Sequence, residues 1–270
     1  MDYRSSIAFI GGGNMAEALA GGIARARIVP AESIIVSEPV PERCTYLQEQ
    51  HGFITTDKNT QAAVAGGTIF LAVKPQIIQD VLEEIAPSIN TEQLVISVAA
   101  GITLELLEKS LPGIPVIRSM PNSPALVGSG ATVISPGQSV HADMTHWAVE
   151  LFQAVGTCHV LPEDLLDSVT GLSGSGPAYI FRMAEALIEA GMSVGIPADE
   201  STGLVKQTIL GAARLMMETE KTPTELREMV TSPGGTTQAG LAELNEAGFS
   251  EIVVDAVMAA TKRAGELGKG

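Results

Sequence analysis

Apolar and polar positions along the first part of the chain alternate between two patterns. Short apolar runs of strand length occur at Ile7–Ile10, Ile34–Val36, Thr68–Val73, Leu94–Val98, Val116–Arg118, Ala131–Ser135 and Thr157–Val160. Between them lie segments with helical spacing of apolar residues, at Met15–Ala26, Pro41–His51, Ile77–Ile85, Leu104–Lys109 and Ala142–Val155. Strands that alternate with helices in this way predict an α/β fold, in which a parallel sheet carries helices on both faces.

Beyond Pro162 the strand pattern stops, and only helical patterns follow. They cover Ala178–Val194, Glu200–Met217, Thr224–Met229, Thr237–Ala247 and Glu251–Leu267. We therefore predict two domains: a dinucleotide-binding domain over residues 1–162, and an all-helical domain for dimerisation and substrate binding over 163–270.

The two longest patterns of the second domain, 178–194 and 200–217, are apolar on most faces. A helix that is apolar all round must be buried. A domain of about a hundred residues has too small an interior to bury two such helices together with three others. We expect a second subunit to cover them, which gives an intertwined homodimer; the alternative is a compact monomeric bundle.

The charge balance and the residue usage exclude several classes of function. The net charge of −15 over 270 residues argues against nucleic acid or an anionic membrane as a partner, because both demand a basic surface. The chain begins without a signal-peptide pattern, and no uninterrupted apolar run reaches membrane-spanning length, so we expect a cytoplasmic protein. Cys44, Cys158 and the histidines lack the spacing of metal ligands, so we expect no metal site.

The first strand leads into a glycine-rich turn and then a helix. Gly11 permits the tight turn, Gly13 lets a pyrophosphate approach the backbone, and Ala16 keeps the helix close to the strand. Asn14 and Met15 open the helix, whose first amides are free to bind the phosphates. The order strand, glycine turn, helix is typical of a dinucleotide site, so we predict that NADPH or NADH binds here.

The end of the second strand bears on which coenzyme is used. Glu38 stands where an acid would accept hydrogen bonds from the adenosine ribose and repel a 2′-phosphate, which favours NADH. Ser37 and Arg43 could instead receive that phosphate, and Glu38 could be a solvated loop acid. The sequence alone leaves the choice open.

The next two strands end in segments that we also assign to the coenzyme. Ala72, Val73, Lys74 and Pro75 follow one strand, and the small Ala99 and Ala100 follow the other. Ligands of open sheets bind at the carboxyl ends of successive strands. Taken singly, each segment is also compatible with ordinary turn chemistry.

A second candidate site lies in the C-terminal part, in the turn Ser232–Gly240. Pro233 suits the first turn of a helix, so we expect the amides of Gly234, Gly235, Thr236 and Thr237 to point outward unpaired. Such a turn holds a small carboxylate or phosphate. The alternative for the two threonines is helix capping.

In this order, the segments resemble pyrroline-5-carboxylate reductases over nearly the whole chain. The matching segments are FIGGGNMAEA (9–18), LAVKPQ (71–76), SVAAGI (97–102), RSMPNSPA (118–125), LSGSGPAY (172–179) and VTSPGGTT (230–237). The resemblance implies a Rossmann-like domain followed by a helical domain that dimerises, with five dimers in a ring in several members. It places the active site between the coenzyme of one subunit and the helical domain of its partner.

The resemblance also assigns residues and a reaction. Ser232, Gly235, Thr236 and Thr237 match the substrate-binding turn, and Asn59, Lys74, Pro75 and Ala100 match positions that line the coenzyme. The implied reaction is hydride transfer to C5 of the cyclic imine 1-pyrroline-5-carboxylate, which yields L-proline in the last step of proline biosynthesis. Thr237 is our candidate for hydrogen bonding the imine nitrogen. The small residues of 172–179 would leave room beside the nicotinamide, or they form only an interdomain turn.

Three other functions remain open on the sequence. A β-hydroxyacid dehydrogenase would carry a catalytic lysine one helical turn after its glycine motif, but that position holds Ile180. A related imine reductase would use the same two sites. A non-catalytic nucleotide-sensing homologue would keep the fold without the reaction.

Overall fold

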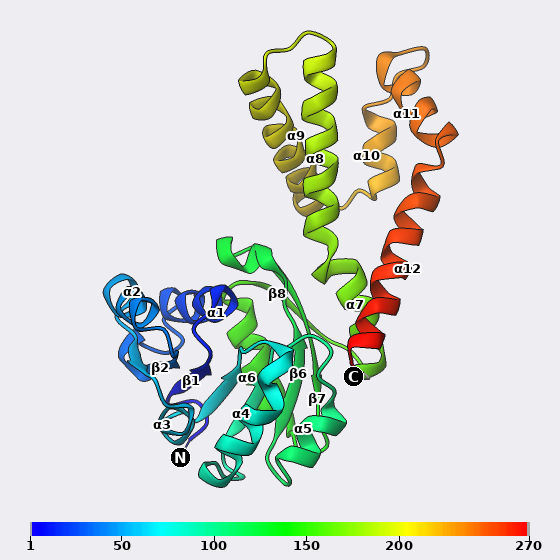
Figure 1. Ribbon diagram of the computed structural model, residues 1–270. Coiled ribbons are helices and arrows are strands. Elements are labelled where there is room, and N and C mark those ends of the chain that lie inside the picture. Colours follow the sequence, from blue (N-terminus) through cyan, green and yellow to red (C-terminus); the bar gives the residue numbers. More distant parts are fainter. Residues whose placement is uncertain (1, 269–270) are drawn as a thin grey trace. The chain divides into compact units, whose positions relative to one another are not determined.

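The computed structural model describes residues 2–268, which pack into two compact units. The first unit comprises the chain up to Ser175 and the stretch from Ala259 onward, and the second comprises Gly176–Met258. In Figure 1 the first unit runs from blue to green and includes the red end of the chain. The domain boundary between residues 162 and 163 stays a prediction.

An eight-stranded sheet with the order β3-β2-β1-β4-β5-β6-β7-β8 forms the centre of the first unit. Its strands are β1 (Ile7–Ile10), β2 (Ile34–Ser37), β3 (Ile54–Thr56), β4 (Thr68–Leu71), β5 (Leu94–Ser97), β6 (Val116–Met120), β7 (Gly130–Pro136) and β8 (Gly156–Val160). Central strands such as β1 and β4 are buried along their whole length, as expected of a sheet covered on both faces.

The sheet is parallel, as predicted, except at one pair, where β7 runs antiparallel to β6. Only residues 121–129 join the two strands, and part of this link is a 3₁₀ helix at Ser123–Val127. A parallel neighbour requires a crossover of a dozen or more residues, so this short link returns the chain in the opposite direction. The remaining pairs of the sheet are parallel.

Helices cover both faces of the sheet, in agreement with the predicted α/β class (Figure 1). They are α1 (Asn14–Arg25), α2 (Pro41–His51), α3 (Asn59–Ala65), α4 (Ile78–Ile85), α5 (Leu104–Ser110), α6 (Ala142–Gln153) and α7 (Leu166–Val169). Phe9 of β1 belongs to one core with α1 and α6, whereas its neighbour Ile10 belongs to a second core with α3, α4 and α5. Successive strand residues point to opposite faces, so the sheet has two separate cores.

The sequence analysis missed β3 and α3. Ile54 is half exposed and β3 has only three residues, so its burial pattern resembles that of a loop. The seven residues of α3 bury only Ala62 and Ala63, which leaves a weak helical pattern. Pairing with β2 on the outer edge of the sheet gives β3 its structure.

The segment before the second unit is a π-helical turn, which overlaps the stretch where the sequence suggested an interdomain turn. Thr170–Gly174 continues directly from α7, and the amide of Ser175 donates to the carbonyl of Thr170 over 2.9 Å. The side-chain amide of Asn122 donates to the carbonyl of Ser173 over 3.0 Å. A side chain at Gly174 would meet the methyl group of Met120, so a small residue is required there. Single π turns inside helices are frequent at functional sites.

The second unit is helical throughout. It contains α8 (Gly176–Ser193), α9 (Ala198–Glu218), α10 (Pro223–Met229), α11 (Thr236–Glu246) and the first half of α12 (Phe249–Leu267). Of the residues 176–258, only Ser201 is buried in the single chain, and Phe181 of α8 is 63% exposed. No helix within residues 2–268 is both long and apolar enough to cross a membrane.

Candidate active site

Strand register brings the predicted coenzyme segments to one edge of the sheet. Ile10, at the end of β1, pairs with Ser37 of β2 and Leu71 of β4, and Leu71 in turn pairs with Ser97 of β5. The residues that follow these four therefore emerge at the same level. The order of the strands reverses between β1 and β4, and such a switch point is where open α/β sheets bind their ligands.

The glycine-rich turn has the geometry of a pyrophosphate cradle. Gly11 has φ +98°, and a Cβ there would lie 2.7 Å from the carbonyl oxygen of Ala72. At Gly13 a Cβ would meet no described atom within 4 Å, so the backbone is open to a ligand. Gly13 precedes α1, and no described side chain caps that helix, which leaves the amides of Asn14 and Met15 for an anion. These features fit a dinucleotide.

Glu38 is fixed beside this turn by two backbone amides. Its Oε2 accepts from the Gly12 amide over 3.0 Å, and its Oε1 accepts from the Val40 amide over 3.1 Å. The amide of Glu38 itself donates to the Thr56 carbonyl of β3 over 2.9 Å. The carboxylate therefore has a defined position at the end of β2 and is no freely solvated loop acid.

The carboxylate of Glu17, on α1, contacts three polar side chains next to the turn. It binds the Arg43 guanidinium at 2.5 Å, the Tyr46 hydroxyl at 3.1 Å and the His51 ring at 3.0 Å. Burial raises the pKa of Glu17, but the hydrogen bonds from His51, Arg43 and Tyr46 outweigh it and hold that pKa below its ordinary value. Sequence reasoning missed this role of Glu17; an acid in the first turn of a helix was the available signal.

The remaining coenzyme candidates also lie at this edge. Ser37 is buried and donates to Oδ1 of Asn59 over 2.7 Å, and Asn59 donates to Glu84 over 2.7 Å. Lys74 is exposed, and Pro75 begins a 3₁₀ helix after it. Ala99 is buried and Ala100 is partly buried, ahead of Gly101 at φ +77°. Ala72 and Val73, which follow β4, are partly buried.

The C-terminal turn differs from its prediction. Pro233 lies outside the helix, because the Gly235 amide donates to the Ser232 carbonyl over 3.0 Å and closes a turn with Gly234 at φ +71°. Proline followed by a glycine of positive φ is typical of a type II turn. The Gly234 amide donates to the Gln238 side chain over 2.6 Å. Of the four amides expected to be unpaired, two are therefore engaged.

The other two amides, those of Thr236 and Thr237, lie in the first turn of α11. α11 begins at Thr236 with Gly235 as its N-cap, and no described side chain caps it. The first amides of a helix have no partner within the helix, so those of Thr236 and Thr237 are available to an anion. Both residues are exposed, as is Ser232.

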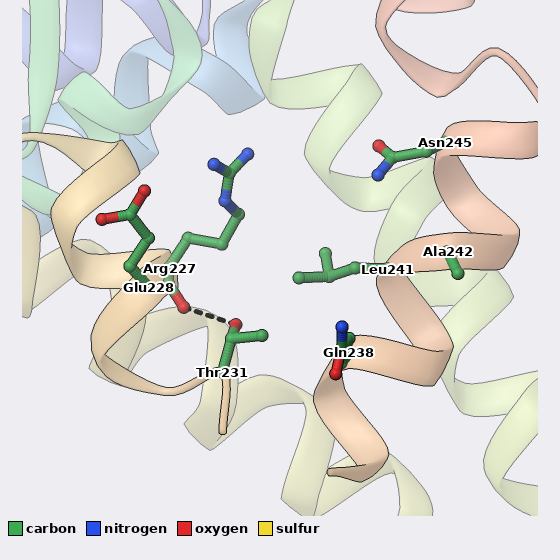
Figure 2. A pocket seen from close by; sticks show the side chains of 7 residues that line it. All are labelled: Arg227, Glu228, Thr231, Gln238, Leu241, Ala242 and Asn245. Atoms are coloured by element: carbon green, nitrogen blue, oxygen red, sulfur yellow. Dashed lines mark hydrogen bonds between the residues drawn. The ribbon is translucent and has the colours of Figure 1, made fainter. Parts of the chain in front are cut away.

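A pocket of about 360 Å³ opens between α10 and α11 (Figure 2). Its lining is Arg227, Glu228, Thr231, Gln238, Leu241, Ala242 and Asn245. On the α10 side of the pocket, the Thr231 hydroxyl donates to the Arg227 carbonyl over 2.6 Å (Figure 2). None of the predicted substrate residues lines this pocket, so we do not assign the substrate to it.

Comparison with known proteins identifies the family. A family model for pyrroline-5-carboxylate reductase dimerisation matches residues 163–267, and one for NADP oxidoreductases, coenzyme F420-dependent, matches 6–101. A pyrroline-5-carboxylate reductase of Synechocystis is 43% identical over 97% of this chain and 98% of its own length. The chain belongs to the pyrroline-5-carboxylate reductase family. The resemblance drawn from the sequence motifs is thereby confirmed.

Other members of the family agree in sequence and structure. The Escherichia coli reductase is 37% identical over 98% of the chain and 99% of its own. The solved Coxiella burnetii reductase superposes with a TM-score of 0.93 at 39% identity, covering 99% of this chain and 100% of that one. A Plasmodium falciparum pyrroline carboxylate reductase solved with NADP bound has a TM-score of 0.89 at 31% identity, with 99% and 100% covered. The β-hydroxyacid dehydrogenase interpretation is left without support.

Proposed function

We propose that this protein reduces 1-pyrroline-5-carboxylate to L-proline with NADH or NADPH. The 43% identity over 97% of the chain to a pyrroline-5-carboxylate reductase carries this proposal. The intact glycine-rich turn and the intact C-terminal turn both support it. A nucleotide-sensing homologue that had lost the reaction would have no need of the second turn.

The coenzyme is assigned to the edge of the sheet in the first unit. The turn at Gly11 and Gly13 and the first amides of α1 would hold the pyrophosphate, and Glu38 would hold the adenosine ribose. The segments that follow β4 and β5 would hold the nicotinamide half. When bound, the coenzyme supplies the hydride, while the protein fixes the geometry. The assigned residues are Gly11, Gly13, Asn14, Met15, Ser37, Glu38, Asn59, Ala72, Val73, Lys74, Pro75, Ala99 and Ala100.

The substrate is assigned to the turn before α11. The amides of Thr236 and Thr237 would bind the substrate carboxylate, and the type II turn through Ser232 and Gly235 would hold them in place. The hydroxyl of Thr237 would hydrogen bond the ring nitrogen, which keeps its proton as C5 is reduced. A protonated iminium needs little further activation, so positioning accounts for most of the rate.

A homodimer is part of the proposal. The helices of 176–258 leave large apolar side chains exposed in the single chain, which a monomeric bundle would bury. The match of 163–267 to a dimerisation family agrees with a partner on this unit. We further propose that the partner's turn meets the coenzyme of the first subunit. A ring of five dimers and a cytoplasmic location stay predictions.

The test is oxidation of NADH and of NADPH by the purified protein with pyrroline-5-carboxylate, with the six-membered imine homologue as a control. We expect turnover with the five-membered ring and formation of L-proline. Turnover only with the six-membered ring would indicate a related imine reductase. Coenzyme binding without turnover on either ring would favour the sensing function.

A further inference from the structure

We propose that Glu38 and Glu17 together select NADH against NADPH, Glu38 directly and Glu17 by holding Arg43. This inference rests on the proposed function of the coenzyme site. The two coenzymes differ only by a phosphate on the adenosine 2′-oxygen, which adds about two negative charges near neutral pH. Selection is therefore decided by the groups that surround the end of β2.

Glu38 provides the attractive contact for NADH and the repulsive one for NADPH. Its carboxylate is fixed by the amides of Gly12 and Val40 at 3.0 and 3.1 Å, so it cannot move aside without breaking both bonds. A fixed carboxylate accepts hydrogen bonds from ribose hydroxyls, as acids at this position do in dinucleotide folds. The same carboxylate repels a 2′-phosphate.

Arg43 is the side chain best placed by sequence to receive a 2′-phosphate, but it is already bound. Its Nε donates to the Gly12 carbonyl over 2.7 Å, and its Nη2 contacts Glu17 at 2.5 Å. The guanidinium also lies over the ring of Tyr46, 5.0 Å from the centroid. To bind a phosphate, Arg43 would have to leave a carboxylate that shields its charge. Glu17 thus removes the cation that NADPH needs.

Ser37, the other phosphate candidate, is committed as well. Ser37 is buried, and its hydroxyl donates a hydrogen bond to Oδ1 of Asn59 over 2.7 Å. Lys58 is a neighbouring exposed cation, two residues after the Thr56 carbonyl to which the Glu38 amide donates. Lys58 is therefore included in the test as an exposed cation that could offset the carboxylate.

The experiment measures coenzyme binding directly, independent of turnover. Dissociation constants of NADH and NADPH would be obtained by nicotinamide fluorescence, and those of 5′-AMP and 2′,5′-ADP by competition. For the unaltered protein we expect NADH to bind about tenfold or more tightly than NADPH, from repulsion between close charges. The two fragments should show the same order, since they lack the nicotinamide.

Three variants and a matched control assign the effect to its residues. Glu38→Gln should weaken NADH and strengthen NADPH, which removes most of the preference. Glu17→Ala should strengthen NADPH by releasing Arg43 and change NADH binding little. Lys58→Gln should keep the preference. Glu42→Gln, an exposed acid in the first turn of α2, makes the same change in net charge and should leave both affinities as they were.

Distinct outcomes overturn the inference and the proposed function. Equal affinity for the two coenzymes, or tighter binding of NADPH, overturns the selection while leaving the reductase assignment intact. An unchanged ratio of the NADH and NADPH dissociation constants in Glu38→Gln also overturns the selection. If a variant fails to fold, the comparison of 5′-AMP with 2′,5′-ADP on the unaltered protein decides whether the selection exists. Absence of binding by either coenzyme overturns both.

Discussion

The guanidinium of Arg118, on β6, contacts the carboxylate of Glu163 at 3.0 Å, and the same carboxylate oxygen accepts from the Leu104 amide over 2.7 Å. The second guanidinium nitrogen lies 3.0 Å from Asp167 in α7. Only 7% of the Arg118 side chain is exposed. One arginine therefore joins a central strand, the start of α5 and the segment that leads into the π turn.

Arg118→Met should lower the free energy of unfolding by about 2 kcal/mol, because it removes hydrogen bonds to two carboxylates. Urea unfolding of the purified protein measures this. Arg263→Met is the matched control: the Arg263–Glu266 pair is 66% and 48% exposed, and such pairs contribute little. Equal losses in the two variants would show that the buried position of Arg118 gives it no special weight.

Gly11→Ala should impair both stability and coenzyme binding, whereas Gly13→Ala should impair coenzyme binding alone. Gly11 has a positive φ and faces the Ala72 carbonyl, so Gly11→Ala should destabilise the fold by about 1–3 kcal/mol and abolish coenzyme binding. The space beside Gly13 is open, so Gly13→Ala should keep stability and lose binding only, since the pyrophosphate needs that approach. Thermal unfolding and coenzyme titration separate the two effects. Full coenzyme binding by Gly13→Ala would exclude the assigned pyrophosphate position.

The contribution of Glu17 to stability should depend on pH. Its pKa is lowered in the folded protein, so its ionised form stabilises the fold above the unfolded-state value of about 4.3, and this gain is lost as the pH falls through the folded pKa. The stability difference between the unaltered protein and Glu17→Gln should be largest near neutral pH. It should shrink below about pH 4. Chemical unfolding across this range measures it, and a difference independent of pH would contradict the assignment.

Thr237→Ala should reduce kcat by about 10²-fold, the loss expected when a reacting group is misplaced by about 1 Å, with coenzyme affinity near its original value. Thr237→Ser keeps the hydroxyl and should retain most of the turnover. Steady-state kinetics with pyrroline-5-carboxylate gives both values. If Thr237→Ala turned over normally, the hydroxyl would have no part in the reaction and only capping would remain.

Phe181→Glu should convert the dimer to monomers. Phe181 of α8 is 63% exposed in the single chain, and a charge there would be desolvated by a partner subunit. Light scattering after size-exclusion chromatography reports the mass. A monomeric mass for the unaltered protein at micromolar concentration would remove the homodimer from the proposal.

The sequence predicted most of the first unit because its central strands are apolar along their whole length. Ile7–Ile10 and Leu94–Val98 were placed to within a residue of β1 and β5. Strand direction was not readable, because burial at β7 is the same whichever way the strand runs. The small residues of 172–179 suggested an interdomain turn, whereas Asn122 and Met120, distant in sequence, pack against a π turn at Thr170–Gly174.

The candidate site was predictable where backbone chemistry alone defines it. Gly11 and Gly13 follow from the geometry of the turn, and Glu38 from its place after β2. The engagement of Arg43 by Glu17 depends on α1 and α2 packing side by side, and no local pattern encodes that. In the C-terminal turn, Pro233 suggested the first turn of a helix, but it equally suits the second position of a type II turn.

The last stretch of the chain, from Ala259, belongs to the first unit, which also contains the N-terminal part of the chain. Leu267 lies against Gly101, and Gly265 lies near Asp167. In terms of chain connectivity, the helical unit is an insertion within the nucleotide-binding unit. A chain that ended before Ala259 would lack part of the first unit. A protein truncated after Met258 would lose part of the wall beside Gly101 while keeping every residue assigned to the coenzyme.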